Sequence, residues 1–440
     1  MLDIGFWMIF ILTPAAIWFL LKAAGEKVNQ ISVLNITTMS IYIFSVLGLL
    51  PLFYQLDQYR VEIGVTNPGM VFVVLLCCFT SIVFFLSGAI FFRKTTGLKP
   101  NPIFSSEIQA LRKMDFIALL LAFGLVLAVL VLYLSKVGQV AIFVALKDGA
   151  AAAAVARSDM GNNFNKYHRY SLIMHDLGMV VTLSFFALWL FKKNLLRLIL
   201  FVAAFAVSGF ITVMATEKAP FVSLLMALFM VYYLMRKNGF VPKKDVALLG
   251  AFIISILVVF YVYFMGSANL IAALMSVFSR AFSGSVSPAY FYLEYAPHVQ
   301  DFYWFKTFPN PGHVLPYEPV RYTVDIMSWK FPERGGSGVV GSMPTVFWGE
   351  AYLNFGFLGI PIVSFVMGCF VAAVGYLVSR LQPNPVSIAF LVWVIFHLKA
   401  LGVTGFSGFL YDFKFIAVGL VVVIILSATG RLRLKNRKDA

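Results

Sequence analysis

The segment MVFVVLLCCFTSIVFFLSGAIFF, residues 70–92, contains 23 residues and no charged side chain. A helix of about 20 apolar residues crosses the hydrocarbon core of a bilayer, so this segment predicts a transmembrane helix. Similar segments recur along the 440-residue chain, of which 61% is hydrophobic and only 12% is charged. Soluble domains contain about 25% charged residues, so the composition excludes a soluble globular protein.

Eleven segments have the length and composition of membrane spans. The first has no basic residue before it and no small-residue cleavage site, so we expect a retained span and not a removed signal peptide. The predicted fold is therefore an all-α polytopic bundle, with residues 1–440 as one membrane domain. The spans are approximately Ile4–Leu21, Ile31–Phe53, Met70–Phe92, Phe116–Leu134, Leu172–Phe191, Leu198–Met214, Ala219–Leu234, Val246–Phe264, Phe357–Val378, Val386–Leu401 and Tyr411–Ala428.

The basic residues predict the orientation of these spans. Lys and Arg concentrate in the short cytoplasmic connections of membrane proteins. An outside N-terminus places most of the 34 basic residues in short connections on one side, together with the basic tail, residues 430–440. That side is predicted to be cytoplasmic, and the long loop, residues 267–344, is predicted to be outside. The net charge of +15 is then mainly a topology signal, and nucleic-acid binding explains it poorly.

The chain lacks the motifs of several enzyme classes. It contains no phosphate-binding P-loop, no H-E-x-x-H and no D-x-D pair. The three cysteines, Cys77, Cys78 and Cys369, fall inside predicted spans, where cysteine behaves as a small apolar residue. We therefore predict no metal site and no other cofactor, and an ATP-driven pump has no support.

The first outer segment of interest is Ser135–Tyr170. Its apolar stretch Val140–Leu146 is too short to span a bilayer and is predicted to be interfacial or re-entrant. Arg157 and Arg169 follow, and we predict that both face an anionic lipid head group. An interfacial helix with solvated charges is the alternative.

The second outer segment is the turn Ala215–Pro220. Pro220 suits the first turn of a helix, and Thr216 or Glu217 can cap its start. The amino end of a helix favours anions, and Lys218 adds a full positive charge there. Alternatively, Glu217 only caps the helix and Lys218 only reaches the membrane interface.

The third outer segment is the loop of residues 267–344, which is basic and aromatic. Arg280 lies near the membrane boundary, where a charge is costly and often functional. The prolines of the loop argue against regular helix, and a short helix, Thr345–Phe355, is predicted to end at Gly356. Aromatic faces suit sugar rings. The loop residues predicted to bind substrate are Tyr290, Tyr292, Arg321 and Arg334.

Three features, in this order, resemble one protein family. A span ends in the turn Thr216-Glu217-Lys218, Arg280 follows near the next outer boundary, and the long loop closes with GSMPTVFWGEAYLNFGFLG, residues 341–359. This arrangement resembles the Wzy-type O-antigen polymerases, which join oligosaccharide repeat units in bacteria. The closing segment is also similar to those of O-antigen ligases and SEDS peptidoglycan polymerases. The resemblance covers the architecture of the whole chain through short motifs.

The resemblance implies a metal-free, GT-C-like enzyme in the bacterial inner membrane, with its active site facing the periplasm. A hydroxyl of one polyprenyl-diphosphate-linked oligosaccharide attacks the anomeric carbon of another, and polyprenyl diphosphate leaves. The implied partners are these lipid-linked oligosaccharides and membrane lipids, with a chain-length-regulating co-polymerase as a candidate. Arg157, Lys218 and Arg280 match outer-face cations of the family, whereas Glu217 departs from its usual small or polar residue.

The attacking hydroxyl needs a general base within hydrogen-bonding reach. Glu350 is our first candidate because burial against Trp348 and Tyr352 would raise its pKa. Glu217 is the second candidate and Asp325 on the loop is the third. For both glutamates a capping or packing role is the alternative.

Two other functions stay open at this point. A flippase for the same lipid would show internal repeats and charges at the membrane midplane, whereas here the charges crowd the outer side. A ligase that moves the finished polymer onto a lipid core is not separated from a polymerase by sequence.

Overall fold

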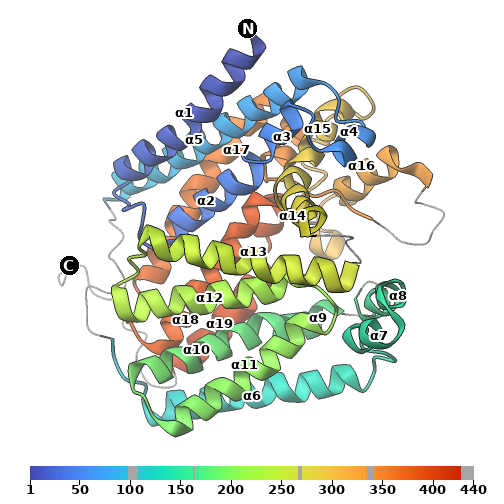
Figure 1. The fold of residues 1–440 in the computed structure, drawn as a ribbon. Helices are drawn as coiled ribbons and strands as arrows, with labels where there is room; N and C mark the ends of the chain where they lie inside the picture. Colours follow the sequence, from blue (N-terminus) through green and yellow to red (C-terminus); the bar gives the residue numbers. More distant parts are fainter. Residues whose placement is uncertain (98–107, 162–163, 166, 266–269, 334–340, 428–440) are drawn as a thin grey trace.

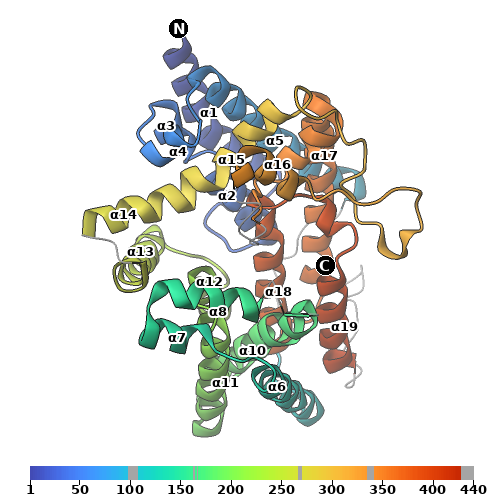
Figure 2. The same ribbon diagram turned by 90° about the vertical axis from the view of Figure 1, so that its right-hand side faces the viewer.

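The computed structural model describes residues 1–97, 108–161, 164–165, 167–265, 270–333 and 341–427. In these residues the regular structure is helical, apart from one isolated bridge between Gln30 and Phe240. Figures 1 and 2 show the arrangement. The α-helices are α1 (Leu2–Ala23), α2 (Val33–Ser45), α3 (Leu49–Phe53), α4 (Gln58–Glu62), α5 (Pro68–Thr96), α6 (Lys113–Leu134), α7 (Ala141–Asp148), α8 (Ala150–Met160), α9 (Tyr167–Ser171), α10 (Gly178–Phe191), α11 (Leu195–Val213), α12 (Lys218–Lys237), α13 (Lys243–Met265), α14 (Leu270–Phe278), α15 (Gly284–Tyr295), α16 (Tyr322–Lys330), α17 (Trp348–Ser379), α18 (Pro385–Leu398) and α19 (Phe413–Ser427).

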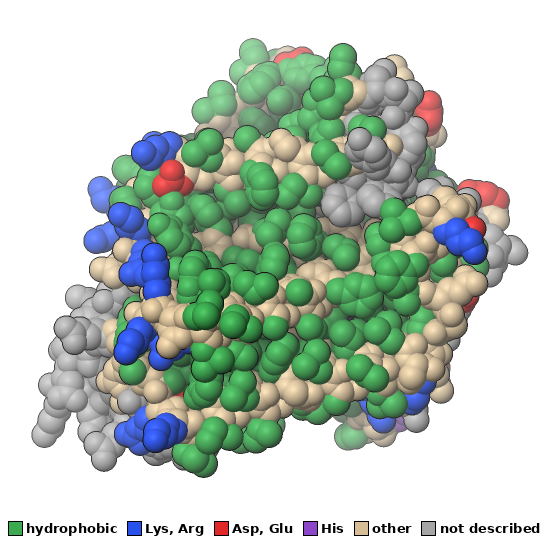
Figure 3. Space-filling view, turned by 60° about the horizontal axis from the view of Figure 1, so that its bottom comes forward, with side chains coloured by type: hydrophobic (Ala, Val, Ile, Leu, Met, Phe, Trp, Pro, Cys, Tyr) green, Lys and Arg blue, Asp and Glu red, His purple; other side chains and the backbone are tan. Residues whose placement is uncertain are grey.

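Ten helical segments in the described residues are long and apolar enough to cross a membrane. They coincide with ten of the eleven predicted spans, which confirms a polytopic helical membrane protein. The remaining predicted span, Val246–Phe264, lies within α13, a helix of 23 residues. Figure 3 shows the apolar surface that such a protein presents to lipid, with Lys and Arg side chains gathered at its left-hand edge.

Helices α5 and α17 form the most extensive helix pair of the molecule. A Cβ on Gly88 would lie 2.0 Å from the carbonyl oxygen of Phe365, and a Cβ on Gly368 would lie 1.8 Å from that of Phe85. The two backbones therefore touch, which only glycine permits. Membrane helices associate through such small residues because lipid offers no hydrophobic gain for larger ones.

The two ends of the bundle differ in structure. We call the end with α4, α7, α8, α16 and the segment 296–321 the loop face (right in Figure 1, and facing the viewer in Figure 2). We call the opposite end, with the connections 24–32, 192–194, 238–242 and 380–384, the tail face. The tail-face connections are short, and one of them is fixed by a 2.8 Å bond from Ile31 N to the carbonyl of Gly239.

Several local predictions on the loop face can be compared with the structure. The apolar stretch 140–146 forms the short helix α7, which does not span. The backbone of Gly356 is not helical, with φ 65° and ψ −158°, so a helical segment ends there as predicted, although it begins at Trp348 and a second segment of α17 continues beyond the kink. The prolines of the long loop do not exclude helix everywhere, because α16 forms between Pro319 and Pro332.

Two π-helical turns interrupt the helices near the loop face: Leu172–Leu177, which is η1, and Ser279–Ser283, which is η2. Such turns are rare and occur frequently at functional sites. The second contains Arg280, so the local distortion lies at one of the predicted site residues.

Candidate functional site

Three predicted cations meet at the loop face although they come from distant parts of the sequence. Arg157 lies in the last turn of α8, Lys218 begins α12, and Arg280 lies in η2. Thr216 turns the chain into α12 with a φ of 57°, and the Nζ atom of Lys218 is buried. The positive charges of Arg280 and Arg157 repel the positive charge of the Lys218 ammonium group. Like charges repel, so an anion bound near them would stabilise the arrangement.

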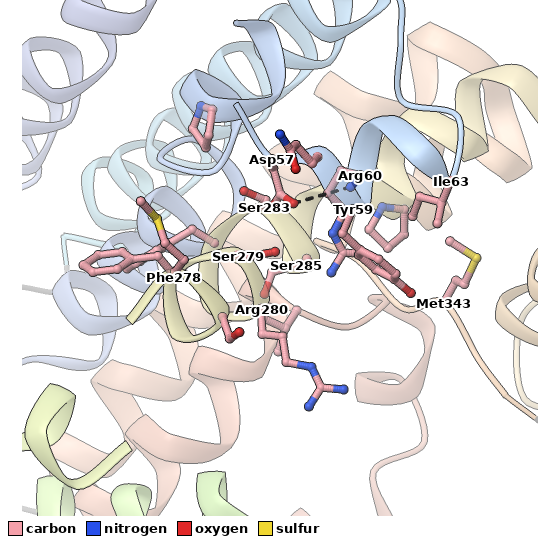
Figure 4. A pocket seen from close by; sticks show the side chains of 18 of the residues that line it. Asp57, Tyr59, Arg60, Ile63, Phe278, Ser279, Arg280, Ser283, Ser285 and Met343 are labelled. Carbon is pink, nitrogen blue, oxygen red and sulfur yellow. Dashed lines mark hydrogen bonds between the residues drawn. The ribbon is translucent and has the colours of Figure 1, made fainter. Parts of the chain in front are cut away.

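A cavity with a volume of about 1490 Å³ lies beside Arg280 (Figure 4). Its walls come from the α2–α3 turn, α4, η2 with the start of α15, and residues 342–344. Two arginines, Arg60 and Arg280, line this cavity together with serine side chains and apolar side chains. The hydroxyl groups belong to Ser276, Ser279, Ser283, Ser285 and Ser342, and the apolar side chains include Leu47, Pro51, Leu56, Met275, Phe278 and Phe282.

Arg60 is a member of the site that the sequence analysis did not identify. Its helix α4 is capped by Asp57, whose carboxylate accepts a 3.4 Å hydrogen bond from Arg60 N. A Cβ on Gly284 would lie 2.7 Å from Nη2 of Arg60, so the glycine leaves room for the guanidinium group. Burial lowers the pKa of Arg60, Asp57 and Tyr59 raise it, and Arg280 lowers it. Arginine keeps its charge despite such shifts.

Arg280 thus acts on both Lys218 and Arg60. Four acidic residues adjoin these cations in the sequence: Asp57, which caps α4, Glu62, Asp159 and Glu217, which precedes Lys218. Arg60 and Arg280 lie where the polar and the apolar walls of the cavity meet. This combination suits an anionic group attached to an apolar chain.

Comparison with protein-family models, with curated proteins and with solved structures finds no match for this chain. The resemblance to the Wzy-type polymerases is therefore still a prediction, and the geometry of the site must support any function by itself.

Two other predicted cations, Arg169 and Arg321, lie away from the cavity wall. Arg169 lies on α9 and Arg321 precedes α16, and both side chains are exposed to the surroundings. Neither residue lines the cavity. Arg334 lies outside the described residues. A role for these three residues in substrate binding stays a prediction.

Tyr290 and Tyr292 on α15 were predicted to contact sugars, but the structure buries both rings, with 3% and 0% of their surface exposed. The Tyr290 hydroxyl accepts a 3.3 Å hydrogen bond from Asn67 N. The Tyr292 hydroxyl donates a 2.6 Å hydrogen bond to the carbonyl of Met343, a residue of the cavity wall. Neither tyrosine lines the cavity, and the hydrogen bond of Tyr292 holds Met343 of the wall in place.

Glu350, the first candidate for the general base, is 1% exposed and is not part of the cavity wall. Its Oε2 atom accepts a 3.0 Å hydrogen bond from Ser407 N. The Tyr322 hydroxyl and Glu350 Oε2 lie 2.1 and 2.2 Å from the position of a Cβ on Gly405. Burial, and next the charge of Glu350, raise the pKa of Tyr322 well above its usual value, so this phenol keeps its proton. The geometry favours the alternative packing role for Glu350.

Glu217 is exposed at the start of α12, and its side chain makes no capping hydrogen bond. The prediction that it caps the helix through its side chain is therefore wrong. Its charge acts on Tyr167, and it adjoins Lys218 of the cationic cluster. Asp325 lies on α16, where its carboxylate accepts a 3.4 Å hydrogen bond from the Tyr303 hydroxyl. Of the three acidic candidates, Glu217 is the one next to the cations.

A second group of charged residues ties α18, α19 and η1 together. His397 pairs with Asp412, and Asp176 accepts a 3.2 Å hydrogen bond from Trp393 Nε1 and lies 3.6 Å from Lys414 Nζ. These contacts join α18 to η1 and to the start of α19, which indicates a packing role for the four charged residues.

Proposed function

We propose that this protein is a metal-independent, GT-C-type glycosyltransferase that polymerises polyprenyl-diphosphate-linked oligosaccharides. In this proposal the loop face is the periplasmic face of a bacterial inner membrane. The observation that supports it most is the convergence of Arg157, Lys218 and Arg280 beside a large cavity.

The chemistry of the transfer accounts for these cations. The acceptor hydroxyl attacks the anomeric carbon, the bond from that carbon to the diphosphate oxygen breaks, and negative charge develops on the diphosphate. Cations held at fixed positions stabilise this charge as it forms. The buried Nζ of Lys218 and the guanidinium groups of Arg157 and Arg280 supply the required hydrogen-bond donors.

The proton of the attacking hydroxyl must pass to a base. Glu217 adjoins Lys218 and is exposed at the loop face, so it can meet an acceptor without rearrangement of the core. Glu350 would first have to leave its hydrogen bond with Ser407. We therefore propose Glu217 as the first candidate for the base and Glu350 as the second.

The test uses the purified protein in lipid nanodiscs with lipid-linked repeat units and EDTA in the buffer. Polymerase activity gives a ladder of products that differ by one repeat. Transfer of sugar only to a separate lipid core would show a ligase, and movement of the lipid across the bilayer without elongation would show a flippase. Loss of activity in EDTA with rescue by Mg²⁺ would contradict the metal-independent mechanism.

A further inference from the structure

The cavity and the cationic cluster overlap at one residue only. Arg280 lines the cavity, whereas Arg157 and Lys218 do not. The positive charge of Arg280 repels that of Lys218 in the cluster and also that of Arg60 in the cavity wall. The loop face therefore has two groups of cations that share Arg280.

The cavity is large enough to hold a molecule much bigger than a single ion. Its volume of about 1490 Å³ exceeds the roughly 300–1,000 Å³ of pockets for drug-sized molecules. The wall formed by η2 and the start of α15 carries Ser279, Ser283 and Ser285, as Figure 4 shows. Leu47, Pro51 and Phe282 supply apolar surface to the same space. An amphiphile with a polar head and an apolar chain matches both kinds of wall.

Arg60 has the chemistry to hold the head group. Its Nε atom is buried and has no hydrogen-bond partner in the described residues. The planar guanidinium group of arginine binds phosphate oxygens through paired hydrogen bonds. The space beside Gly284 positions this group, and the repulsion between Arg60 and Arg280 would be relieved by an anion that binds both.

We propose that the cavity is the acceptor site of the polymerase, in which Arg60 and Arg280 bind the diphosphate of a second lipid-linked oligosaccharide. This inference rests on the proposed function, because a polymerase must hold a donor and an acceptor together. The donor diphosphate lies at Arg157, Lys218 and Arg280. The serine hydroxyls of the cavity wall bind sugar hydroxyls of the acceptor, and its apolar side chains contact the lipid.

The two sites differ in what their cations do. The donor diphosphate becomes the leaving group, so cations there act on the transition state. The acceptor diphosphate stays attached to its sugar throughout, so Arg60 contributes equally to the ground state and the transition state. Loss of such uniform binding raises KM and leaves kcat unchanged.

The experiment separates the two substrates chemically. In the donor analogue, the hydroxyl group that would attack another unit is methylated, so this analogue can act only as a donor. In the acceptor analogue, a methylene group replaces the oxygen between the anomeric carbon and the diphosphate, so this analogue can act only as an acceptor. Arg60→Gln is expected to raise the KM for the acceptor about 10- to 100-fold, the scale of a hydrogen bond to a charged group. Its kcat and donor KM should stay within about twofold. Arg60→Lys should recover part of the affinity because it keeps the charge without the planar fork.

Lys306→Gln is the matched control, since Lys306 is an exposed cation of the same face that does not line the cavity. It should leave all three constants unchanged. Thermal unfolding of each variant verifies the fold. An acceptor KM within twofold of the native value in Arg60→Gln, or an increase confined to the donor KM, overturns the inference.

A binding measurement distinguishes failure of this inference from failure of the proposed function. Farnesyl diphosphate should occupy two sites in the native protein and one site in Arg60→Gln. If the native protein forms polymer and Arg60→Gln still binds farnesyl diphosphate at two sites, the acceptor site is overturned and the proposed function stands. If the native protein binds at two sites, Arg60→Gln loses one of them and no polymer forms, the polymerase proposal is overturned and the Arg60 binding site is supported. Inorganic pyrophosphate should bind the Arg60 site more weakly than farnesyl diphosphate, and equal affinity contradicts a lipid ligand.

Discussion

The loop face and the tail face both carry cations, but the cations have different surroundings. On the tail face, Arg93 pairs with Glu26, and Arg236 donates a 2.6 Å hydrogen bond to the carbonyl of Leu190. On the loop face, Arg280 acts on two other cations, Arg60 and Lys218. Cations that are satisfied locally are explained by topology. The convergence of like charges on the loop face supports the proposed anion site there.

The largest expected effect concerns the orientation of the two faces. Alkaline phosphatase fused after residue 300, on the loop face, should be active, because this enzyme matures only outside the cytoplasm, where its disulfides form. The same enzyme fused after residue 193, on the tail face, should be inactive. The reverse pattern would place the cationic cluster in the cytoplasm and contradict the proposed periplasmic reaction.

The next effect concerns Arg280, which belongs to both cationic groups. Arg280→Gln should lower kcat about 10²–10³-fold, the scale for one lost transition-state donor, and Arg280→Lys should recover only part of it. The rate of polymer formation by purified protein measures both. Lys193→Gln, which removes an exposed cation of the tail face, should stay within about twofold. Equal decreases of kcat in Arg280→Gln and Lys193→Gln would show that cations of the two faces do not differ in function.

The tail-face ion pair should matter to stability and not to catalysis. Arg93 and Glu26 pair with 13% and 7% of their side chains exposed. Removal of one partner from a buried pair costs about 3 kcal/mol or more, so Glu26→Ala should lower the free energy of unfolding by that amount. Chemical denaturation in detergent measures it, with turnover per folded molecule as the second readout. Native stability in Glu26→Ala would show that the pair contributes little.

The smallest effect concerns Glu294 of α15, a half-buried carboxyl group near the loop face. Burial raises its pKa above the ordinary value of 4.5, and Lys330 and the Tyr290 hydroxyl partly oppose that shift. The folded state therefore holds this proton to higher pH than the unfolded state. The resulting stability is complete below about pH 4.5 and is lost as the pH rises through the folded pKa. Glu294→Gln should flatten this part of the profile of unfolding temperature against pH, and an unchanged slope would contradict the assignment.

The spans could be predicted from sequence because the signal for each one lies within about 20 consecutive residues. The pairing of α5 with α17 could not, since Gly88 and Gly368 are 280 residues apart and only the fold brings their helices together. The same reason explains Glu350. Its burial depends on Ser407, a partner 57 residues away, and no local pattern reports that contact.

The site was predicted in part. Arg157, Lys218 and Arg280 were grouped from their predicted place at the outer membrane boundary, and the structure brings them together. Arg60 was missed, although a signal existed. It lies in a short connection predicted to be outside, where the topology rule disfavours arginine, and Asp57 precedes it at capping distance. A basic residue on the disfavoured side needs a reason other than topology.

The central claim is that loop-face cations stabilise a departing diphosphate, and Lys218 tests it most directly. The measurement is kcat for polymer formation by purified Lys218→Gln, with Lys306→Gln as the exposed loop-face control and lipid-substrate binding measured in parallel. The account predicts a kcat lower by about 10²–10³-fold, with the donor still bound and the control near the native rate. A kcat within twofold of the native value, in folded protein that binds its donor, would contradict it.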